Sequence, residues 1–220
     1  MYIIFDLDGT LIDSSKGIYQ AFCLSLSGLS LAPPSYPSFK PLIGPTADVI
    51  FSKLYPDASV DSKSIFYSTF RSLYDSTHYK YFSLYHGVHS MLESLAHLDF
   101  TMSVITNKPS QPSKSLISST PGLTGMFTDI IGADYFASSL GIPRLSKKNL
   151  SLLYLFEKNQ LSPSQAIYIG DTPSDMIAAQ QTQCNFIPCT YGYGFTTSDP
   201  FTISASSPSL IPLCVSKILH

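Results

Sequence analysis

An apolar run at the start of the chain ends in two closely spaced carboxylates. Tyr2-Ile3-Ile4-Phe5 leads directly into Asp6-Leu7-Asp8-Gly9-Thr10, which is typical of a short buried strand followed by a tight turn. Residues i and i+2 at a strand end are expected to point the same way, so the two acids would be crowded at one sheet edge. Such crowding needs a shared proton or a compensating cation, most often Mg²⁺ where the ligands are oxygens. The pattern favours a cation-binding edge over an ordinary Asp-Gly turn.

From Tyr85 onward, strand-like segments alternate with helical patterns. We expect strands at 101–105, 129–132, 166–169, 185–188 and 201–204. We expect helices at 88–95, 111–118, 149–158, 174–181 and 209–219. This alternation predicts an α/β, Rossmann-like parallel sheet with helices on both faces. Ligands of such sheets bind beyond the carboxyl ends of the strands, so the residues that follow the strands are the candidate site.

Residues 14 to 83 show no parallel-strand pattern and contain apolar residues at helical spacing instead. Three such groups occur: Ile18, Ala21, Phe22 and Leu26; Val49, Ile50 and Leu54; and Phe66, Phe70, Leu73 and Tyr74. We therefore expect a core formed by residues 1–13 and 84–220, with residues 14–83 inserted as a helical cap domain. An insertion that enters at the active edge is well placed to act as a lid.

Composition narrows the class of protein. The chain has 220 residues, is 44% hydrophobic, and carries 15 acidic against 13 basic side chains, for a net charge of −2. This balance argues against a nucleic-acid or anionic-membrane partner. No apolar run approaches a membrane-spanning length, the start of the chain is unlike a signal peptide, and the four cysteines form no C-x-x-C pair. We expect a cytoplasmic protein with reduced thiols, either a monomer or a homodimer.

Three further groups of polar residues are expected at the same sheet edge: Thr106 and Asn107, the pair Lys147-Lys148, and Asp171 with Asp175. Together with the opening segment they resemble, in order, the four signature segments of the haloacid dehalogenase superfamily of phosphohydrolases. Those segments are D-x-D-G-T, a strand-end Thr, a Lys and G-D-x-x-x-D. Each segment alone is weak evidence, but the ordered set is specific, and the resemblance covers the whole chain.

The resemblance implies a role for each carboxylate. Asp6 would be the nucleophile that attacks phosphate and a ligand of Mg²⁺. Asp8 would be the general acid and base and would lend its backbone carbonyl to the metal. Asp171 would complete the metal site, and Asp175 would be either a further ligand or a residue of the second coordination shell. These roles are physically consistent, because a carboxylate that attacks a phosphate dianion faces charge repulsion that a metal ion and an ammonium group offset.

The resemblance also implies which groups hold the phosphoryl group. Thr106 and the amide of Asn107 would bind it at the end of their strand, and a lysine would neutralise its charge. The spacing to Gly170-Asp171 favours Lys148 over Lys147. For a Lys-Lys pair at a helix start, the alternative is a solvated surface.

The helical insertion resembles the cap of phosphoglycolate phosphatases and β-phosphoglucomutases. The segments that favour the phosphoglycolate phosphatase-like branch are Leu11–Ser14, Phe39–Pro45, Leu84–Val88 and Thr190–Gly194. His86 and His78 depart from the usual Pro and Gly of that branch. Within the cap, Lys40, Gly44 and Arg71 are candidates to approach the leaving group, and Arg71 could bind a substrate carboxylate bidentately. A plain solvent-exposed helix arginine is the alternative.

The function expected from this resemblance is Mg²⁺-dependent hydrolysis of a small phosphorylated metabolite through an aspartyl-phosphate. A nucleoside 5′-monophosphatase or an inorganic pyrophosphatase would share these motifs, and a β-phosphoglucomutase is disfavoured by the cap segments. A catalytically silent binding protein on the same scaffold would have lost Asp6 or Asp8, and both are present. The sequence leaves the substrate open, because the cap selects the leaving group and its contacts are not encoded in helical periodicity.

Overall fold

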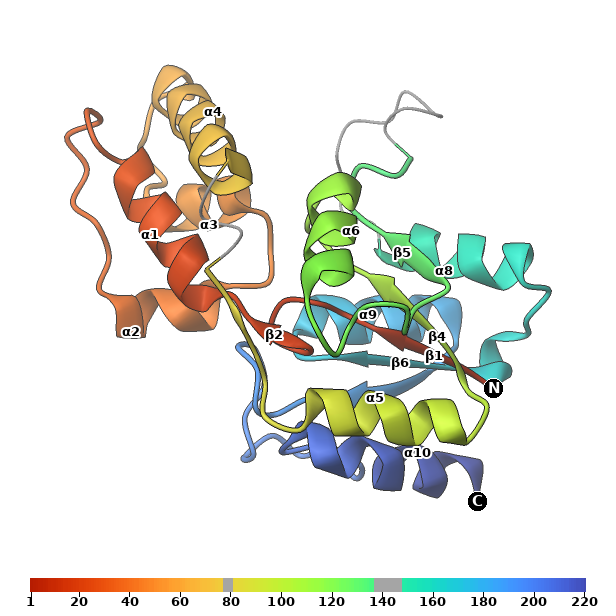
Figure 1. Ribbon diagram of the computed structural model, residues 1–220. Helices are drawn as coiled ribbons and strands as arrows, with labels where there is room; N and C mark the ends of the chain where they lie inside the picture. The colour runs from red at the N-terminus through yellow and green to blue at the C-terminus, as the bar shows by residue number, and fades with distance from the viewer. Residues whose placement is uncertain (77–80, 137–147) are drawn as a thin grey trace.

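A five-stranded parallel sheet forms the centre of the computed structural model, which describes residues 1–76, 81–136 and 148–220 (Figure 1). The strand order is β5-β4-β1-β6-β7. The strands are β1 (Tyr2–Phe5), β4 (Thr101–Ile105), β5 (Asp129–Ile131), β6 (Ala166–Gly170) and β7 (Asn185–Pro188). In the register of the sheet, Phe5 pairs with both Val104 and Ile169. The three central strands therefore end almost level, which brings the residues that follow them to one edge.

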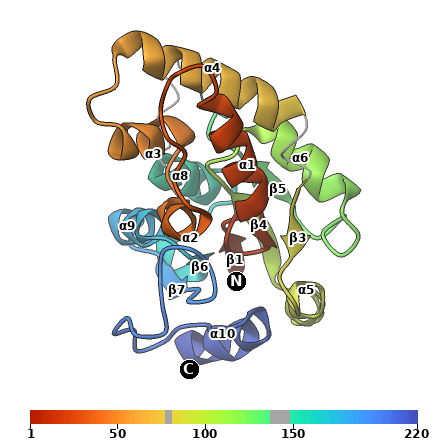
Figure 2. The same cartoon turned by 90° about the vertical axis from the view of Figure 1, so that its left-hand side faces the viewer.

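Helices cover both faces of this sheet (Figures 1 and 2). They are α5 (Val88–His97), α6 (Ser110–Ser119), α8 (Lys148–Lys158), α9 (Pro173–Thr182) and α10 (Ile211–Leu219). The alternation along β1 sends Ile3 and Phe5 into a core with α5 and α10, and Tyr2 and Ile4 into a core with α8 and α9. Each such buried side chain contributes about 1.5–3 kcal/mol. The predicted α/β architecture is confirmed.

A separate helical layer lies beside the sheet and packs around its own apolar cluster (Figure 1). It comprises α1 (Ser15–Ser25), α2 (Tyr36–Phe39), a 3₁₀ turn (Lys40–Leu42), α3 (Ala47–Leu54) and α4 (Val60–Ser76). Its interior is largely aromatic, with Phe66 stacked on Phe51 at 4.3 Å and on Phe70 at 6.0 Å between ring centroids. Such ring pairs add to the burial energy and help to fix the helices relative to one another.

Two short strands connect the helical layer to the sheet. They are β2 (Ile12–Asp13) and β3 (Ser83–Leu84), which pair antiparallel. The sequence did not predict this pairing, because two residues are too few for a periodic signal. The paired strands hold the entry and the exit of the helical layer together above the end of β1.

Two expectations in detail differ from the structure. Phe201–Ser204 was expected to be a strand, but only Ala205 makes a single bridge to Cys189. The cause is local, because the Phe201 N–H donates to the Asp199 carbonyl at 2.8 Å in a tight turn and is not available to a sheet. Between the helical groups expected at 18–26 and 49–54 the pattern predicts no further helix, but the structure contains α2 and the 3₁₀ turn there. Both have proline in the first turn, where its missing N–H costs little. Within the described residues, none of the helices combines the length and the apolarity needed to cross a bilayer.

Candidate active site

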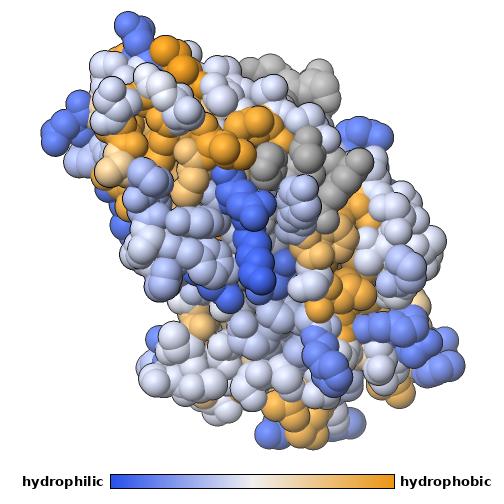
Figure 3. All heavy atoms as spheres, turned by 60° about the vertical axis from the view of Figure 1, so that its left-hand side comes forward, coloured by the Kyte–Doolittle hydropathy of each residue, from blue (hydrophilic) through white to orange (hydrophobic). Residues whose placement is uncertain are grey.

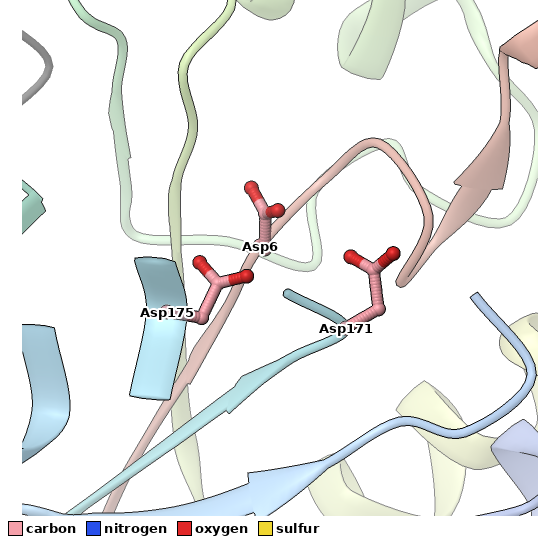
Figure 4. Close-up of side chains that lie close together, drawn as sticks. All are labelled: Asp6, Asp171 and Asp175. Carbon is pink, nitrogen blue, oxygen red and sulfur yellow. The ribbon is translucent and has the colours of Figure 1, made fainter. Parts of the chain in front are cut away.

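The carboxyl ends of β1 and β6 bring a cluster of acids together. Figure 4 shows Asp6 after β1, Asp171 after β6 and Asp175 from α9, with their carboxylates close together. One carboxylate oxygen of each lies within 4.8 Å of the others, and all three residues are buried. Three acids so close in a buried site repel one another strongly unless cations or protons compensate their charge.

Asp171 is held in place by two glycines. A Cβ atom on Gly9, whose φ is +89°, would lie 2.1 Å from Asp171 Oδ2, and one on Gly192 would lie 2.3 Å from Asp171 Cβ. The same carboxylate accepts a hydrogen bond from the Tyr193 N–H at 2.7 Å and one from Thr10 Oγ1 at 3.3 Å. Only a backbone without side chains can approach so closely, so these glycines fix the orientation of Asp171.

The carboxylate of Asp175 has both oxygens engaged by protein donors. Oδ2 accepts from the Thr172 N–H at 3.0 Å and from Thr172 Oγ1 at 2.6 Å, which caps the first turn of α9. Oδ1 accepts from the Tyr168 hydroxyl at 2.7 Å and from Lys148 Nζ at 2.5 Å. With four donors around it, Asp175 is arranged to orient Lys148.

Lys148 is the first residue of α8 and is the cation of the cluster. Its Nζ lies 3.0 Å from Asp6 Oδ2 and 2.5 Å from Asp175 Oδ1, and the side chain is buried. Burial lowers the pKa of Lys148, but the nearby Asp175 and Asp6 carboxylates outweigh this and raise it. Lys148 therefore stays a cation at any physiological pH. Lys147 and Arg144 lie outside the described residues, as does His78.

Asp6 carries charge that the protein alone does not compensate. Burial raises its pKa from 3.8 to about 7, against the opposing effect of Lys148, and neighbouring Asp175 raises it further. The pKa of Asp171 is also raised well above its usual range, by burial and then by Asp6. Asp6 Oδ1 is buried and has no hydrogen-bond partner among the described residues. An orphaned carboxylate oxygen beside further buried acids fits a hard divalent cation.

Asp8 lies in a different environment from Asp6. Its Oδ1 accepts from Ser14 Oγ at 2.5 Å and from Lys108 Nζ at 2.9 Å. The Asp8 charge also raises the pKa of Asp6, although less than the Asp175 charge does. Asp6 therefore has negative charge around it from Asp8 as well as from Asp171 and Asp175.

The loop after β4 supplies the residues that face the acids from the other side. The Thr106 N–H donates to the Ile131 carbonyl at 3.0 Å, and Thr106 Oγ1 accepts from the Lys108 N–H at 3.1 Å. Asn107 Nδ2 donates to the Gly44 carbonyl at 2.7 Å, which joins this loop to the helical layer. Sequence reasoning assigned no role to Lys108, although its place two residues after Thr106 at a strand end was an available signal.

A cavity lies between these residues and the helical layer. Its enclosed volume is about 100 Å³, and it is partly open to solvent. Of the predicted site residues, those that line it are Asp6, Asp8, Thr106, Asn107, Gly44 and Arg71. Figure 3 shows a band of hydrophilic side chains on this side of the molecule, with apolar patches beside it.

The three cap candidates are placed differently. Gly44 has φ +142° and offers its carbonyl to Asn107, and a Cβ there would lie 2.8 Å from Thr172 Cγ2. Arg71 lines the cavity and forms an ion pair with Asp75 one helical turn away. Lys40 is not among the cavity-lining residues; its Nζ lies 3.6 Å from Asp13 Oδ2.

Comparison with known proteins is consistent with this geometry. Residues 3–189 match the family model described as haloacid dehalogenase-like hydrolase. A phosphoglycolate phosphatase of Vibrio parahaemolyticus is 30% identical, over 99% of this chain and 94% of that protein. Another, of Aliivibrio fischeri, is 31% identical, over 95% of this chain and 90% of that protein. A solved haloacid dehalogenase-like hydrolase from Streptococcus pneumoniae superposes with a TM-score of 0.83 at 26% identity, covering 96% of each chain.

Proposed function

Since the chain belongs to the haloacid dehalogenase-like hydrolase family, we propose that it is a Mg²⁺-dependent phosphatase that hydrolyses a small phosphate monoester through an aspartyl-phosphate. The observation that carries the proposal is the buried cluster of Asp6, Asp171 and Asp175 with Lys148, in which Asp6 Oδ1 has no partner among the described residues. Asp6 of this cluster lines the cavity beside the helical layer, where a small phosphorylated metabolite would bind.

Asp6 is the nucleophile in this proposal. Its carboxylate attacks phosphorus, the bond from phosphorus to the leaving oxygen breaks, and the phosphoryl group is transferred to Asp6 as an acyl phosphate. Lys148, 3.0 Å from Asp6, places positive charge where the phosphoryl oxygens gather. Thr106, at the end of the adjacent strand, offers its hydroxyl to the same oxygens.

Asp8 moves the protons. It protonates the leaving oxygen in the first step and removes a proton from the attacking water in the second, which regenerates Asp6 and releases phosphate. The position of Asp8 supports this role, because it lines the cavity but lies outside the acid cluster and has its own partners, Ser14 and Lys108. The two neighbouring acids thus act separately.

The residues that would hold Mg²⁺ are Asp6, Asp171 and the backbone carbonyl of Asp8. When bound, the ion would offset the negative charge that the nucleophile and the phosphate bring together. Asp175 contributes by holding Lys148, since its oxygens already accept from four donors.

Residues 14–83 act as the cap in this proposal, and residues 1–13 and 84–220 as the catalytic core. Closure of the cap excludes water from the cavity and brings its residues to the leaving group. The names of the relatives and the presence of Arg71 in the cavity support phosphoglycolate, whose leaving group carries a carboxylate, as the substrate class.

A panel of phosphate esters tests the proposal. The purified protein should release phosphate from phosphoglycolate in the presence of Mg²⁺, lose this activity in excess chelator, and regain it when Mg²⁺ is restored. Ca²⁺ should substitute poorly, because its looser coordination misplaces the nucleophile. Nucleoside 5′-monophosphates, sugar phosphates and pyrophosphate in the same panel separate the related activities. Full activity in excess chelator, or no hydrolysis of any ester, would refute the proposal.

A further inference from the structure

Lys108 joins the catalytic edge to the helical cap. Its Nζ donates to Asp8 Oδ1 at 2.9 Å and to the hydroxyl oxygen of Tyr74, on α4 of the cap, at 2.6 Å. The ammonium also lies 4.8 Å from the centre of the Tyr74 ring. Lys108 and Tyr74 are each only 5% exposed. A buried ammonium is therefore held between one residue of the core and one residue of the cap.

The contacts with the described residues leave one donor of this ammonium for a ligand. A lysine ammonium has three N–H groups, and the contacts with Asp8 and Tyr74 use two of them. Lys108, Asp8 and Tyr74 all line the cavity. Burial lowers the pKa of Lys108, but Asp8 and Tyr74 outweigh it and raise the pKa, so the group remains charged. A hydrogen bond from a charged donor inside a cavity is strong, because little water competes for that donor.

We propose that Tyr74 is a positioning residue supplied by the cap, which holds Lys108 so that its remaining N–H binds the leaving oxygen of the substrate. The inference rests on the proposed phosphatase function and extends it. As the bond to phosphorus breaks, its electron pair stays on the leaving oxygen, which Asp8 protonates. A charged N–H next to that oxygen stabilises the charge that develops before the proton arrives.

The position of Tyr74 makes this arrangement dependent on the cap. The hydroxyl that completes the Lys108 environment belongs to α4, whereas Asp8 and Lys108 belong to the core. Lys108 is thus held by two acceptors only when the cap covers the core as it does here. A substrate that favours closure of the cap therefore also completes the stabilisation of its own leaving group.

Tyr74→Phe tests the inference because it removes the hydroxyl and keeps the ring that stacks on Phe70. Two substrates are compared, phosphoglycolate with its poor alkoxide leaving group and p-nitrophenyl phosphate with its good one. We expect kcat to fall about tenfold for the alkyl phosphate and less than twofold for the aryl phosphate, with KM little changed, because only a poor leaving group needs the donor. Equal losses on both substrates, or no loss, would overturn the inference.

Tyr55→Phe is the matched control. It also removes one tyrosine hydroxyl contact within the cap, the exposed hydrogen bond from Tyr55 to the Ala32 carbonyl at 2.6 Å, away from the cavity. It should leave the ratio of alkyl to aryl turnover unchanged. A second control places Tyr74→Phe in a Lys108→Met background, where it should cost less than twofold further if Tyr74 acts through Lys108. A full tenfold loss in that background would show that Tyr74 acts independently.

A labelling experiment tests the contact without using activity. The wild type and Tyr74→Phe are reacted with a small amine-selective reagent, and the labelling rate of each lysine, buried ones included, is followed by mass spectrometry. Lys108 should react several times faster in the variant, while buried Lys148, which does not contact Tyr74, serves as the internal reference. An unchanged Lys108 rate would overturn the inference. If the wild type releases no phosphate but Lys108 labelling responds, the proposed function fails and the contact stands.

Discussion

The two walls of the cavity are built from different chemistry. The core wall is charged: Asp6, Asp8 and Lys108 line it, with Asp6 paired to Lys148 and Asp8 paired to Lys108. The cap wall is mainly apolar and aromatic, with residues such as Ile50 and Phe70, and Arg71 in this wall forms an ion pair with Asp75. The core wall is thus arranged for a reaction and the cap wall for contact with the rest of a substrate.

The difference predicts how substitutions on each wall should fail. In the core, the charged groups depend on one another at short range, so a single change should affect the chemical step whatever the substrate. In the proposed function, cap side chains contact the leaving group, so a single change there should alter which substrate is preferred. Tyr74 is the exception, because it belongs to the cap and contacts the core cation Lys108.

The largest effect is expected at the nucleophile. Asp6→Asn should abolish turnover of every substrate, because the amide lacks the charge needed to attack phosphorus and to bind a cation. Phosphate release and trapping of the acyl phosphate by rapid acid quench measure this. Hydrolysis by this variant at a wild-type rate, with contaminating phosphatase excluded, would refute the covalent mechanism.

Asp8→Asn should have the next largest effect. It removes the proton donor and acceptor but keeps the nucleophile, so kcat should fall by a factor on the order of 10²–10⁴. The loss should be smaller for p-nitrophenyl phosphate, whose leaving group needs no proton. In contrast to Asp6→Asn, the variant should still form the acyl phosphate from this aryl ester. A variant as inactive as Asp6→Asn on both substrates would contradict separate roles for the two acids.

The parts of the site that were predictable from sequence are those with a local signal. Asp6, Thr106 and Asp171 each follow a buried strand, and in a parallel sheet of level strands this is enough to bring them together. Lys148 was found only through the order of the motifs, because a lysine at a helix start has no signal of its own.

The contact between Lys108 and Tyr74 had no such signal. Tyr74 lies in a helical pattern with Phe66 and Phe70, where an aromatic residue is expected to be packing, and only its hydroxyl distinguishes it. Whether that hydroxyl reaches Lys108 depends on how the cap sits on the core, which is set by packing among distant segments. The strand expected at Phe201–Ser204 was wrong for a different, local reason, since a tight turn with Asp199 uses the N–H that a sheet would need.

In the absence of metal, the stability of the folded protein should depend on pH because of the buried carboxyl group of Asp6. The pKa of Asp6 is raised from 3.8 to about 7 in the folded protein, so the folded state keeps a proton that the unfolded state releases. This contribution to stability is fully present below about pH 3.8 and is lost as the pH rises through about 7. In chelator, the Tm should therefore fall by about 5 °C or more between pH 5 and pH 8.

Mg²⁺ and a matched variant make this prediction specific. Mg²⁺ should raise the Tm more at pH 8 than at pH 5, because at the lower pH it competes with the proton on Asp6. Asp6→Asn should show a smaller fall in Tm with pH and a smaller response to Mg²⁺, which separates this carboxyl from other titrating groups. Equal Mg²⁺ stabilisation at both pH values would contradict a protonated, cation-binding Asp6.

The smallest effect is expected at Arg71 of the cap wall. Arg71→Ala should raise KM for phosphoglycolate several-fold, because a guanidinium facing the cavity can bind its carboxylate, and should leave p-nitrophenyl phosphate nearly unchanged. The rise in KM should be limited to several-fold because Asp75 already pairs with Arg71 and competes with the substrate. Asp75→Asn should therefore lower the same KM, with kcat unaffected. Equal losses on both substrates in Arg71→Ala would indicate that the fold of the cap is disturbed. No loss on either substrate would show that Arg71 takes no part in substrate recognition, and the apolar groups around it would then select the substrate.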